Sequence, residues 1–375
     1  MSTLRVEGIK NAAAASDAIT LATDGTCTAK ITNNLSHRNK VINGAMAISQ
    51  RGTSFTATGS EYTMDRFMHT HSGGLSFDTT TTHDSSAPVG FRKCLKITPD
   101  STQTPSGSMN GAIETKIEGQ DLQDLAFGTS SAKKITISFY AKSAAQNNNH
   151  QYTLQIRKYD DSNDRNMLNR AFTVTSSWQR FTMTFDGDTA ENIRNDNATG
   201  MQILFHLCTG PDDIHAQVNT FSRTTNSSMY TAVTGQSNFM DNTNNEFYLT
   251  GIQLEVGDVA TDFEYRSYGE ELLKCQRYYE VVRMSTGTAM FHAAGNSTIG
   301  FSSHWWYKAD KRIGTPVLAL ANSATFKDDS NTTRTLTGMF TSPDHVMFYN
   351  ANSNGGSFRL FNSNQTISMT SDAEL

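Results

Sequence analysis

Short acidic clusters are the first groups in this sequence whose types and spacing could do chemistry. Residues 160–164 read Asp-Asp-Ser-Asn-Asp, and further aspartate pairs occur at 186–188 and 212–213. Hard cations such as Ca²⁺ require several oxygen ligands of this kind. The 160–164 cluster, however, has no glycine at the sixth and no glutamate at the twelfth position of an EF-hand loop. Because aspartate also favours turns, we expect solvated turns and predict no metal site.

Histidine and carboxylate pairs give no stronger indication of catalysis. His69 and His71 could chelate a transition metal, but a histidine pair in such a Thr- and Gly-rich stretch is usually exposed to solvent. Glycoside hydrolysis needs two carboxylates that face each other across a cleft. Asp262 and Glu264 share one strand face at period two, yet they fit polar contacts at a strand end equally well. The nucleophile-elbow, zinc-protease and phosphate-loop motifs are all missing, so we predict no enzyme activity and no cofactor.

Aromatic side chains are the better indication of function, because sugars bind by stacking their apolar faces on exposed rings. Trp305 and Trp306 are adjacent and therefore point to opposite faces of a strand. Phe301 and Tyr307 share the parity of Trp305, which indicates that this face is buried. Trp306 and His304 then face outward and are the candidate receptor or glycan contact. Partial burial, or contact with another subunit, is the competing interpretation for Trp306.

Alternation of apolar and polar residues predicts β-strands through most of the chain. Residues 135–142 alternate at period two, and the pattern recurs at 152–156, 181–185 and 201–207. Such strands have one buried and one more polar face, and two sheets packed face to face satisfy all of them. We therefore predict a mainly β protein with a central antiparallel jelly-roll β-sandwich. Trp178, just before the third of these strands, is expected in its core.

A strand, a turn and a helix are predicted over residues 247–280. In the helix, which starts near Tyr268, Leu272, Cys275 and Tyr279 fall on one stripe. The residues expected on one face of the preceding strand are Tyr248, Thr250, Ile252, Leu254 and Val256.

These patterns divide the chain into four parts. Residues 1–60 are expected to be an extended segment with short strands, because they have too little apolar area to form a core alone. Residues 61–267 form the sandwich and residues 268–283 a linking helix. Residues 284–375 form a small C-terminal β domain. The polar stretch at 210–245 is far longer than most loops and carries scattered aromatic residues, so we expect it to dock on neighbouring structure.

Composition and charge restrict the class of partner. Lysine and arginine number 31 against 36 acidic residues, a net charge of −5 with no basic block, so no nucleic-acid partner is expected. No apolar run approaches the ~18 residues of a transmembrane helix, so no membrane insertion is expected. The widely spaced Cys27, Cys94, Cys208 and Cys275 are expected to be free, mostly buried thiols of a protein folded in a reducing cytoplasm.

Several motifs together resemble tail fibre proteins of tailed bacteriophages. The similarity covers about residues 38–280, well over half of the chain. The short N-terminal Leu4-Arg5-Val6 with a later Asp24-Gly25 also resembles the virion-anchoring starts of such fibres. The motifs are 38–46 (RNKVINGAM), 50–54 (QRGTS), 62–67 (YTMDRF), 135–143 (ITISFYAKS), 178–181 (WQRF), 247–257 (FYLTGIQLEVG), 263–268 (FEYRSY) and 275–279 (CQRYY).

The resemblance implies a non-enzymatic virion component, assembled in the host cytoplasm, that forms homotrimers and contacts the host surface. In such a trimer, the helix stripe of Leu272, Cys275 and Tyr279 is expected to contact the other copies. Its central domain is similar to carbohydrate-binding jelly rolls, which implies a glycan or protein receptor by analogy of fold. Several such modules open with Asn-Gly-Gly-Phe-Glu and close with paired aspartates that hold a structural calcium. The matching residues here, 43–47 (NGAMA) and 250–251 (TG), lack those carboxylates, so no calcium site is expected.

The leading hypothesis is therefore a trimeric phage tail fibre subunit that attaches to the host surface. Residues 1–60 would bind other tail proteins, and the distal β domain would contact a surface glycan or protein. One alternative is a tail or capsid decoration protein that binds only other virion proteins. A third hypothesis is a glycan depolymerase.

Overall fold

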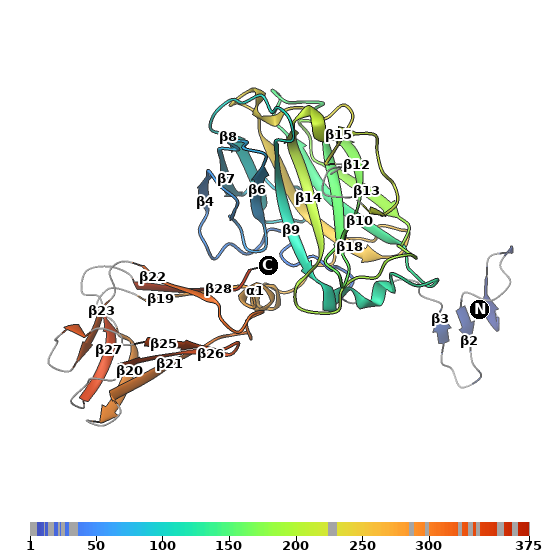
Figure 1. The fold of residues 1–375 in the computed structure, drawn as a ribbon. Coiled ribbons are helices and arrows are strands. Elements are labelled where there is room, and N and C mark those ends of the chain that lie inside the picture. Colours follow the sequence, from blue (N-terminus) through green and yellow to red (C-terminus); the bar gives the residue numbers. More distant parts are fainter. Residues whose placement is uncertain are drawn as a thin grey trace.

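The computed structural model describes residues 6–10, 12–13, 19–21, 23, 27–29, 37–223, 231–284, 289–296, 300–321, 325–328, 333–334, 338–350, 356–361 and 367–374. The chain folds mainly into β-strands, in a central sandwich and a smaller C-terminal β domain, as expected (Figure 1). No helix in these residues combines the length and apolar character needed to cross a bilayer.

Two antiparallel sheets form the sandwich. The first contains, in spatial order, β13 (Gln179–Phe185), β10 (Ile135–Ser143), β18 (Phe247–Val256), β8 (Cys94–Pro99), β7 (Thr79–Asp84) and β4 (Ser54–Ala57). The second contains β16 (Ser222–Arg223), β12 (Arg165–Thr173), β11 (Gln151–Tyr159), β14 (Thr199–Thr209), β9 (Asn110–Glu118), β6 (Met68–Ser72) and β5 (Glu61–Tyr62).

Phe139 lies at the centre of the sandwich core. Its ring lies 5.0 Å from Phe205 and 5.1 Å from Phe172, both edge to face, and stacks on Phe181 at 5.2 Å. Aromatic pairs in these arrangements stabilise a core beyond the burial of their area alone. The alternation seen in the sequence is thereby confirmed, since alternate residues of β10, β11, β13 and β14 fill this core.

Gly251 changes which residues of β18 face the core. Before it, Phe247 and Leu249 are buried there, and after it Ile252 and Leu254 are buried there. A φ of 63° at Gly251 and a shift in the pairing with β10 mark a β-bulge. The prediction of one uninterrupted face along this strand is wrong, because the extra residue reverses the alternation.

The sandwich begins earlier in the sequence than the expected boundary at residue 61. Val41 and Met46 are fully buried in its core, and β4 pairs with β7. The Asn43 amide holds this segment in place: Nδ2 donates to the carbonyls of Ile48 and Asp65, and Oδ1 accepts from the Ile48 N–H. In the part of the N-terminal segment that is described, β1 (Gly8–Ile9), β2 (Ile19–Leu21) and β3 (Cys27–Ala29) form a separate small antiparallel sheet (Figure 1).

The described parts of the long stretch after β14, residues 210–223 and 231–245, dock on the second sheet, as expected. The Val233 N–H donates to Thr153 Oγ1 at 3.0 Å, and Gln236 Nε2 donates to the His206 carbonyl at 2.9 Å. Its elements are η2 (Pro211–Asp213), β15 (Ile214–His215), β17 (Ala232–Val233) and η3 (Phe239–Asp241); a further 3-10 helix, η1 (Gly119–Leu125), follows β9.

The linking helix α1 spans Tyr268–Gln276 and is shorter than the expected 268–283. It begins at Ser267, whose Oγ accepts the Glu270 N–H at 3.2 Å. It ends because the following Tyr-Glu-Val-Val run is aromatic and β-branched, and this run pairs with another strand instead of continuing the helix. Tyr279 is therefore the first residue of β19 (Tyr279–Met284) and not the end of the helix.

The described strands of the C-terminal β domain form two sheets. The first has the order β19, β28 (Ile367–Asp372), β22 (Val317–Ala321). The second has the order β24 (Thr333–Arg334), β23 (Thr325–Asp328), β27 (Gly356–Phe361), β20 (Ala289–Asn296), β21 (Gly300–Trp306), β26 (His345–Asn350), β25 (Gly338–Thr341).

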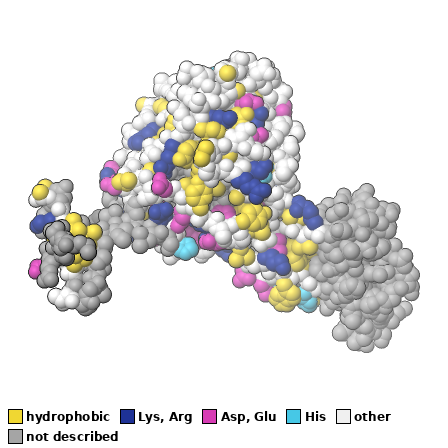
Figure 2. Space-filling view, turned by 180° about the vertical axis from the view of Figure 1, so that it is seen from behind, with side chains coloured by type: hydrophobic (Ala, Val, Ile, Leu, Met, Phe, Trp, Pro, Cys, Tyr) yellow, Lys and Arg dark blue, Asp and Glu magenta, His cyan; other side chains and the backbone are white. Residues whose placement is uncertain are grey.

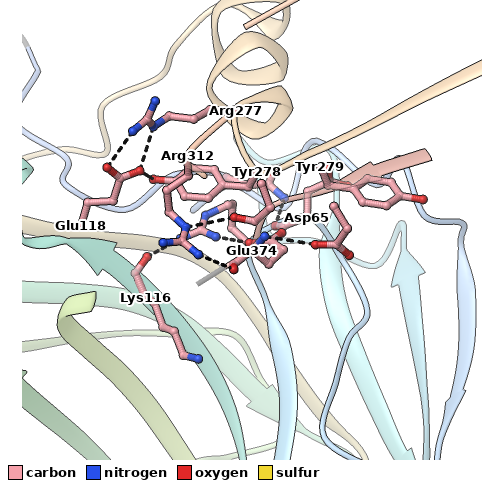
Figure 3. A network of polar contacts seen from close by, with 12 residues as sticks. Asp65, Lys116, Glu118, Arg277, Tyr278, Tyr279, Arg312 and Glu374 are labelled. Carbon is pink, nitrogen blue, oxygen red and sulfur yellow. Dashed lines mark hydrogen bonds and ion pairs between the residues drawn. The ribbon is translucent and has the colours of Figure 1, made fainter. Parts of the chain in front are cut away.

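A buried polar network joins this domain to the sandwich (Figure 3). Glu118 on β9 accepts hydrogen bonds from Arg277 Nε at 2.8 Å and from the Tyr278 hydroxyl at 2.6 Å. Arg66 forms an ion pair with Glu374, and Arg312 Nη2 donates to the Glu374 carbonyl at 2.9 Å. The C-terminal domain is thus fixed to the sandwich by contacts near α1 and by the residues that follow β28.

Candidate functional site

On the surface of the sandwich seen from behind, hydrophobic, basic and acidic side chains lie scattered among other side chains and backbone atoms (Figure 2). This matches a sequence with only 18% charged residues.

Trp306 and His304 lie on β21, on the outward face of the C-terminal domain. β21 pairs with β26 so that Trp306 lies opposite His345. The Trp306 side chain is 61% exposed, whereas the adjacent Trp305 is only 5% exposed. The two tryptophans thus point to opposite faces, as a strand requires.

His304, Trp306 and His345 form a group of three rings at the surface, here named the ring platform. The rings of His304 and Trp306 are exposed, and that of His345 is half-buried. The rings of His304 and Trp306 stack with 19° between their planes and 5.9 Å between their centroids. The His345 ring lies 4.6 Å from Trp306 and 5.2 Å from His304. Strand pairing brings His345 to this position, so its membership in the site does not follow from its own sequence neighbourhood.

The His345 ring is oriented by its neighbours in the β25–β26 turn. Nδ1 lies 2.9 Å from Asp344 Oδ1 and 3.0 Å from Ser342 Oγ. Hydrogen bonds from Ser342 and His345 lower the pKa of Asp344. A nucleophilic triad would use the two imidazole nitrogens for its serine and its aspartate, whereas both partners here contact Nδ1. The arrangement therefore fixes the ring and does not activate Ser342.

The stripe expected to contact other copies in a trimer packs inside the chain instead. Cys275 is 0% and Tyr279 8% exposed, and Leu272 is half-buried. Cys275 and Tyr279 face the sandwich because the short helix turns directly into β19, which leaves no continuous outward stripe. The exposed apolar side chains of α1 are Tyr268 and Leu273.

His69 and His71 do not form a chelating pair, and His69 is not exposed. Both lie on β6, and His69 is fully buried, with its ring stacked on Phe77 at 4.5 Å. His69 Nδ1 donates to the Gly59 carbonyl, and His71 Nδ1 to the Leu75 carbonyl. Burial lowers the pKa of His69 to about 4. The imidazole therefore serves as a neutral core residue.

The acidic residues serve as turn and ion-pair partners. Asp160 Oδ1 accepts the N–H groups of Ser162 and Asp164, both at 2.9 Å, which closes a turn. Asp188 pairs with the buried Lys158 at 3.0 Å. Within the described ranges, no three His, Cys, Asp or Glu side chains are grouped so that they could hold a metal ion.

Glu264 is held by neighbouring backbone and charge. Burial alone would raise the pKa of Glu264, but hydrogen bonds from the N–H groups of Asn39 and Arg38, with the charge of Arg266, lower it. Asp262 and Glu264 follow β18 in a loop and do not share a strand face. An ionised, paired carboxylate of this kind is a poor general acid.

Trp178 is not in the core, contrary to expectation. The ring is half-buried beside the first sheet, 6.1 Å from Tyr248, and Nε1 donates to the Ser86 carbonyl at 2.9 Å. Lys142 Nζ lies 5.5 Å from its centroid. Trp178 immediately precedes β13, so the inward alternation of that strand does not extend to it.

Comparison with solved structures finds partial similarities to a bacteriophage tailspike domain and to carbohydrate-binding modules. The enzymatically active domain of bacteriophage CBA120 tailspike protein 4 is 11% identical with a TM-score of 0.31, over 58% of this chain and 21% of that one. The family 11 carbohydrate-binding module of the Clostridium thermocellum cellulase Lic26A-Cel5E is 12% identical with a TM-score of 0.29, over 56% and 97%. The CBM22-1 xylan-binding domain of Paenibacillus barcinonensis Xyn10C is 12% identical with a TM-score of 0.28, over 55% and 94%.

The chain thus aligns with about a fifth of the length of the tailspike domain. No protein-family model matches the sequence, and no curated protein matches it. Similarities at these TM-scores carry no argument about function, so the functional argument rests on the geometry of the chain itself.

Proposed function

We propose that this chain is a non-enzymatic phage tail fibre subunit that adheres to a host-surface glycan through the ring platform. The observation that carries the proposal is the exposed Trp306 ring, stacked on His304 and flanked by His345. Large exposed rings grouped on a soluble surface are unusual unless a partner covers them.

The chemistry of the platform suits a sugar. The apolar face of a pyranose ring stacks on an indole, and neighbouring imidazole nitrogens can donate to or accept from its hydroxyl groups. Among the described residues, the nitrogens of His304 and Nε2 of His345 have no hydrogen-bond partner and remain available for such bonds. The rings lie on paired strands, which hold a binding surface more precisely than loops do.

The remaining parts of the proposal concern assembly. The chain would act in the virion as a homotrimer, with residues 1–60 bound to other tail proteins. Three copies of a weak site raise the effective concentration of the platform at a cell surface, so low single-site affinity suffices.

Binding of the full chain to an array of bacterial surface polysaccharides tests the platform. We expect Trp306→Ala and His304→Ala to lose most of the signal, with Trp306→Phe intermediate because a smaller ring still stacks. Val317→Ala is the matched control, since it trims another exposed apolar side chain of the same domain. Circular dichroism confirms that each variant folds. Undiminished binding by folded Trp306→Ala would contradict the proposal.

Sedimentation velocity of the full chain tests the assembly. A species with the mass of three chains is expected. A stable monomer across a wide concentration range would count against the trimer.

A further inference from the structure

Two adjoining cavities lie where the β7–β8 loop meets the segment before α1. The first, of about 240 Å³, is lined by the rings of Phe91, Phe263 and Tyr265. The second, of about 290 Å³, is lined by Arg92 and Lys93, among others. The two cavities share Ala47, Arg92 and Tyr268 in their linings, so they form one cleft with an aromatic end and a cationic end.

The aromatic end is a cluster of three rings. Phe263 lies 5.0 Å from both Phe91 and Tyr265, and Phe91 lies 5.5 Å from Tyr265. Tyr265 is 60% exposed and Tyr268 is 62% exposed. Neither hydroxyl has a hydrogen-bond partner among the described residues, so both are available to a ligand.

Two glycines allow these rings to come together. A Cβ on Gly251, the bulge residue of β18, would lie 2.7 Å from Phe91 Cζ. A Cβ on Gly90, which has a φ of 95°, would lie 2.8 Å from the Tyr265 hydroxyl oxygen. The rings therefore occupy space that a side chain at Gly90 or Gly251 would fill. The cleft is thus preformed in the absence of a ligand.

The charges of the cleft are unbalanced in favour of cations. Its two carboxylates, Glu264 and Glu271, are already paired with Arg266, at 3.6 and 3.3 Å. The exposed Arg92 guanidinium has no ion-pair or hydrogen-bond partner in the described chain, and Lys93 Nζ makes only a 3.5 Å contact with Ser85 Oγ. Two cationic side chains are thus available to an anionic ligand.

We propose that this cleft binds a single anionic sugar unit. The sugar ring stacks at Tyr265 and Phe91, and its carboxylate or phosphate group binds Arg92 and Lys93. Ligand sites for drug-sized molecules usually occupy about 300–1,000 Å³, so an aromatic end of about 240 Å³ fits one ring and not an extended oligosaccharide. The inference goes beyond the glycan binding proposed for the ring platform, because it concerns a distinct site and names a charged sugar class.

Saturation-transfer NMR and titration of the full chain with three probes test the proposal. Glucuronate supplies a carboxylate, glucose 6-phosphate supplies a phosphate, and glucose is the neutral control. We expect at least one anion to bind more tightly than glucose, with ring protons in contact with the protein. The relative affinities of the two anions then distinguish the carboxylate from the phosphate.

Substitutions assign the binding to the cleft. Arg92→Gln is expected to weaken the anion about tenfold, as for the loss of a charge-assisted hydrogen bond, and to leave glucose unchanged. Tyr265→Ala is expected to weaken all three probes. Lys133→Gln, which removes an exposed charge elsewhere, is the control and should leave these affinities unchanged.

Three results would overturn the inference. The first is equal binding of glucose and both anions to the unaltered chain, and the second is anion binding that Arg92→Gln does not weaken. The third is a Tyr265→Ala variant that binds the three probes as the unaltered chain does but sediments with a different mass. That result would identify the cleft as a contact between copies of the chain. Failure here leaves the array result for Trp306→Ala untouched, so this inference and the ring-platform proposal are separately refutable.

Discussion

Arg66 and Glu374 form an ion pair inside the protein although 308 positions separate them in the sequence. Their side chains are 1% and 4% exposed. Burial alone would lower the pKa of Arg66, but the opposed charge of Glu374, with Tyr278 and Tyr62, raises it. The guanidinium also stacks over the Tyr278 ring at 3.5 Å and donates to the Lys116 carbonyl. This arrangement makes the pair the centre of the contact between the two domains.

Breaking this pair should destabilise the protein strongly. Glu374→Gln leaves a buried guanidinium without its counter-charge, a change that typically costs about 3–5 kcal/mol. We expect a clear fall in the thermal and urea midpoints. Asp186→Asn, which removes the exposed partner of Lys134, should leave both midpoints unchanged. The double variant Arg66→Met/Glu374→Leu should recover most of the loss; a Glu374→Gln variant as stable as the unaltered chain would refute the assigned role.

Acid should destabilise the sandwich through His69. Its pKa in the folded chain is about 4 against an ordinary 6.5, because burial disfavours the imidazolium. Between pH 4 and pH 6.5, the His69 imidazole therefore binds a proton more readily in the unfolded chain than in the folded one. The contribution of neutral His69 to the free energy of unfolding is complete above pH 6.5 and is lost as the pH falls towards 4. The loss from this group is at most about 3 kcal/mol.

Urea unfolding across this pH range provides the measurement. His69→Gln should be less stable near neutral pH but should show a flatter dependence on acid. His37→Gln, at an exposed position, is the matched control and should keep the slope of the unaltered chain. An unchanged slope in His69→Gln would exclude His69 as the source.

The bulge in β18 should not tolerate a side chain. Gly251→Ala places a Cβ at a φ of 63° and within 2.8 Å of both Phe91 and Tyr140, so we expect a loss of about 1–3 kcal/mol or more. Gly269→Ala is the control: it lies in α1 with open space around it, and it should stabilise the helix by roughly 0.5–1 kcal/mol. Equal effects of the two substitutions on the unfolding midpoint would be inconsistent with the bulge.

The described thiols should be unreactive in the folded protein. Burial raises the pKa of Cys94 to about 12 and also raises the pKa values of Cys208 and Cys275. Only the thiolate reacts with disulfide reagents. In a Cys27→Ser background we expect no rapid reaction with such a reagent before unfolding and three reactive thiols after it. Rapid labelling of the native chain would show that this burial is incomplete.

The sandwich could be predicted from the sequence because strand alternation is local information. Ile135, Ile137 and Phe139 repeat at period two, and all three lie in the core. The same rule failed at Gly251, because a bulge depends on pairing with β10, and at Trp178, because parity does not continue past the end of a strand.

The sites that depend on distant contacts could not be predicted in this way. Period two correctly indicated that Trp306 points outward, but His345 joins it only through the register of β21 and β26. The cleft combines rings from position 91 and from positions 263–265, which no local pattern connects. Tyr265 is a partial exception, since the alternation of aromatic and charged residues over 263–266 indicates a segment held by both packing and charge.

The contacts around Glu374 have a mechanical consequence for the C-terminal domain. The chain leaves the sandwich through α1 into β19, and after β28 it returns so that Glu374 binds Arg66 and Arg51. A force applied at Trp306 would therefore be shared by two neighbouring antiparallel strands, β19 and β28. It would not be carried by a single flexible connection. A C-terminal domain held at both of its ends resists rotation and transmits tension and torque to the sandwich.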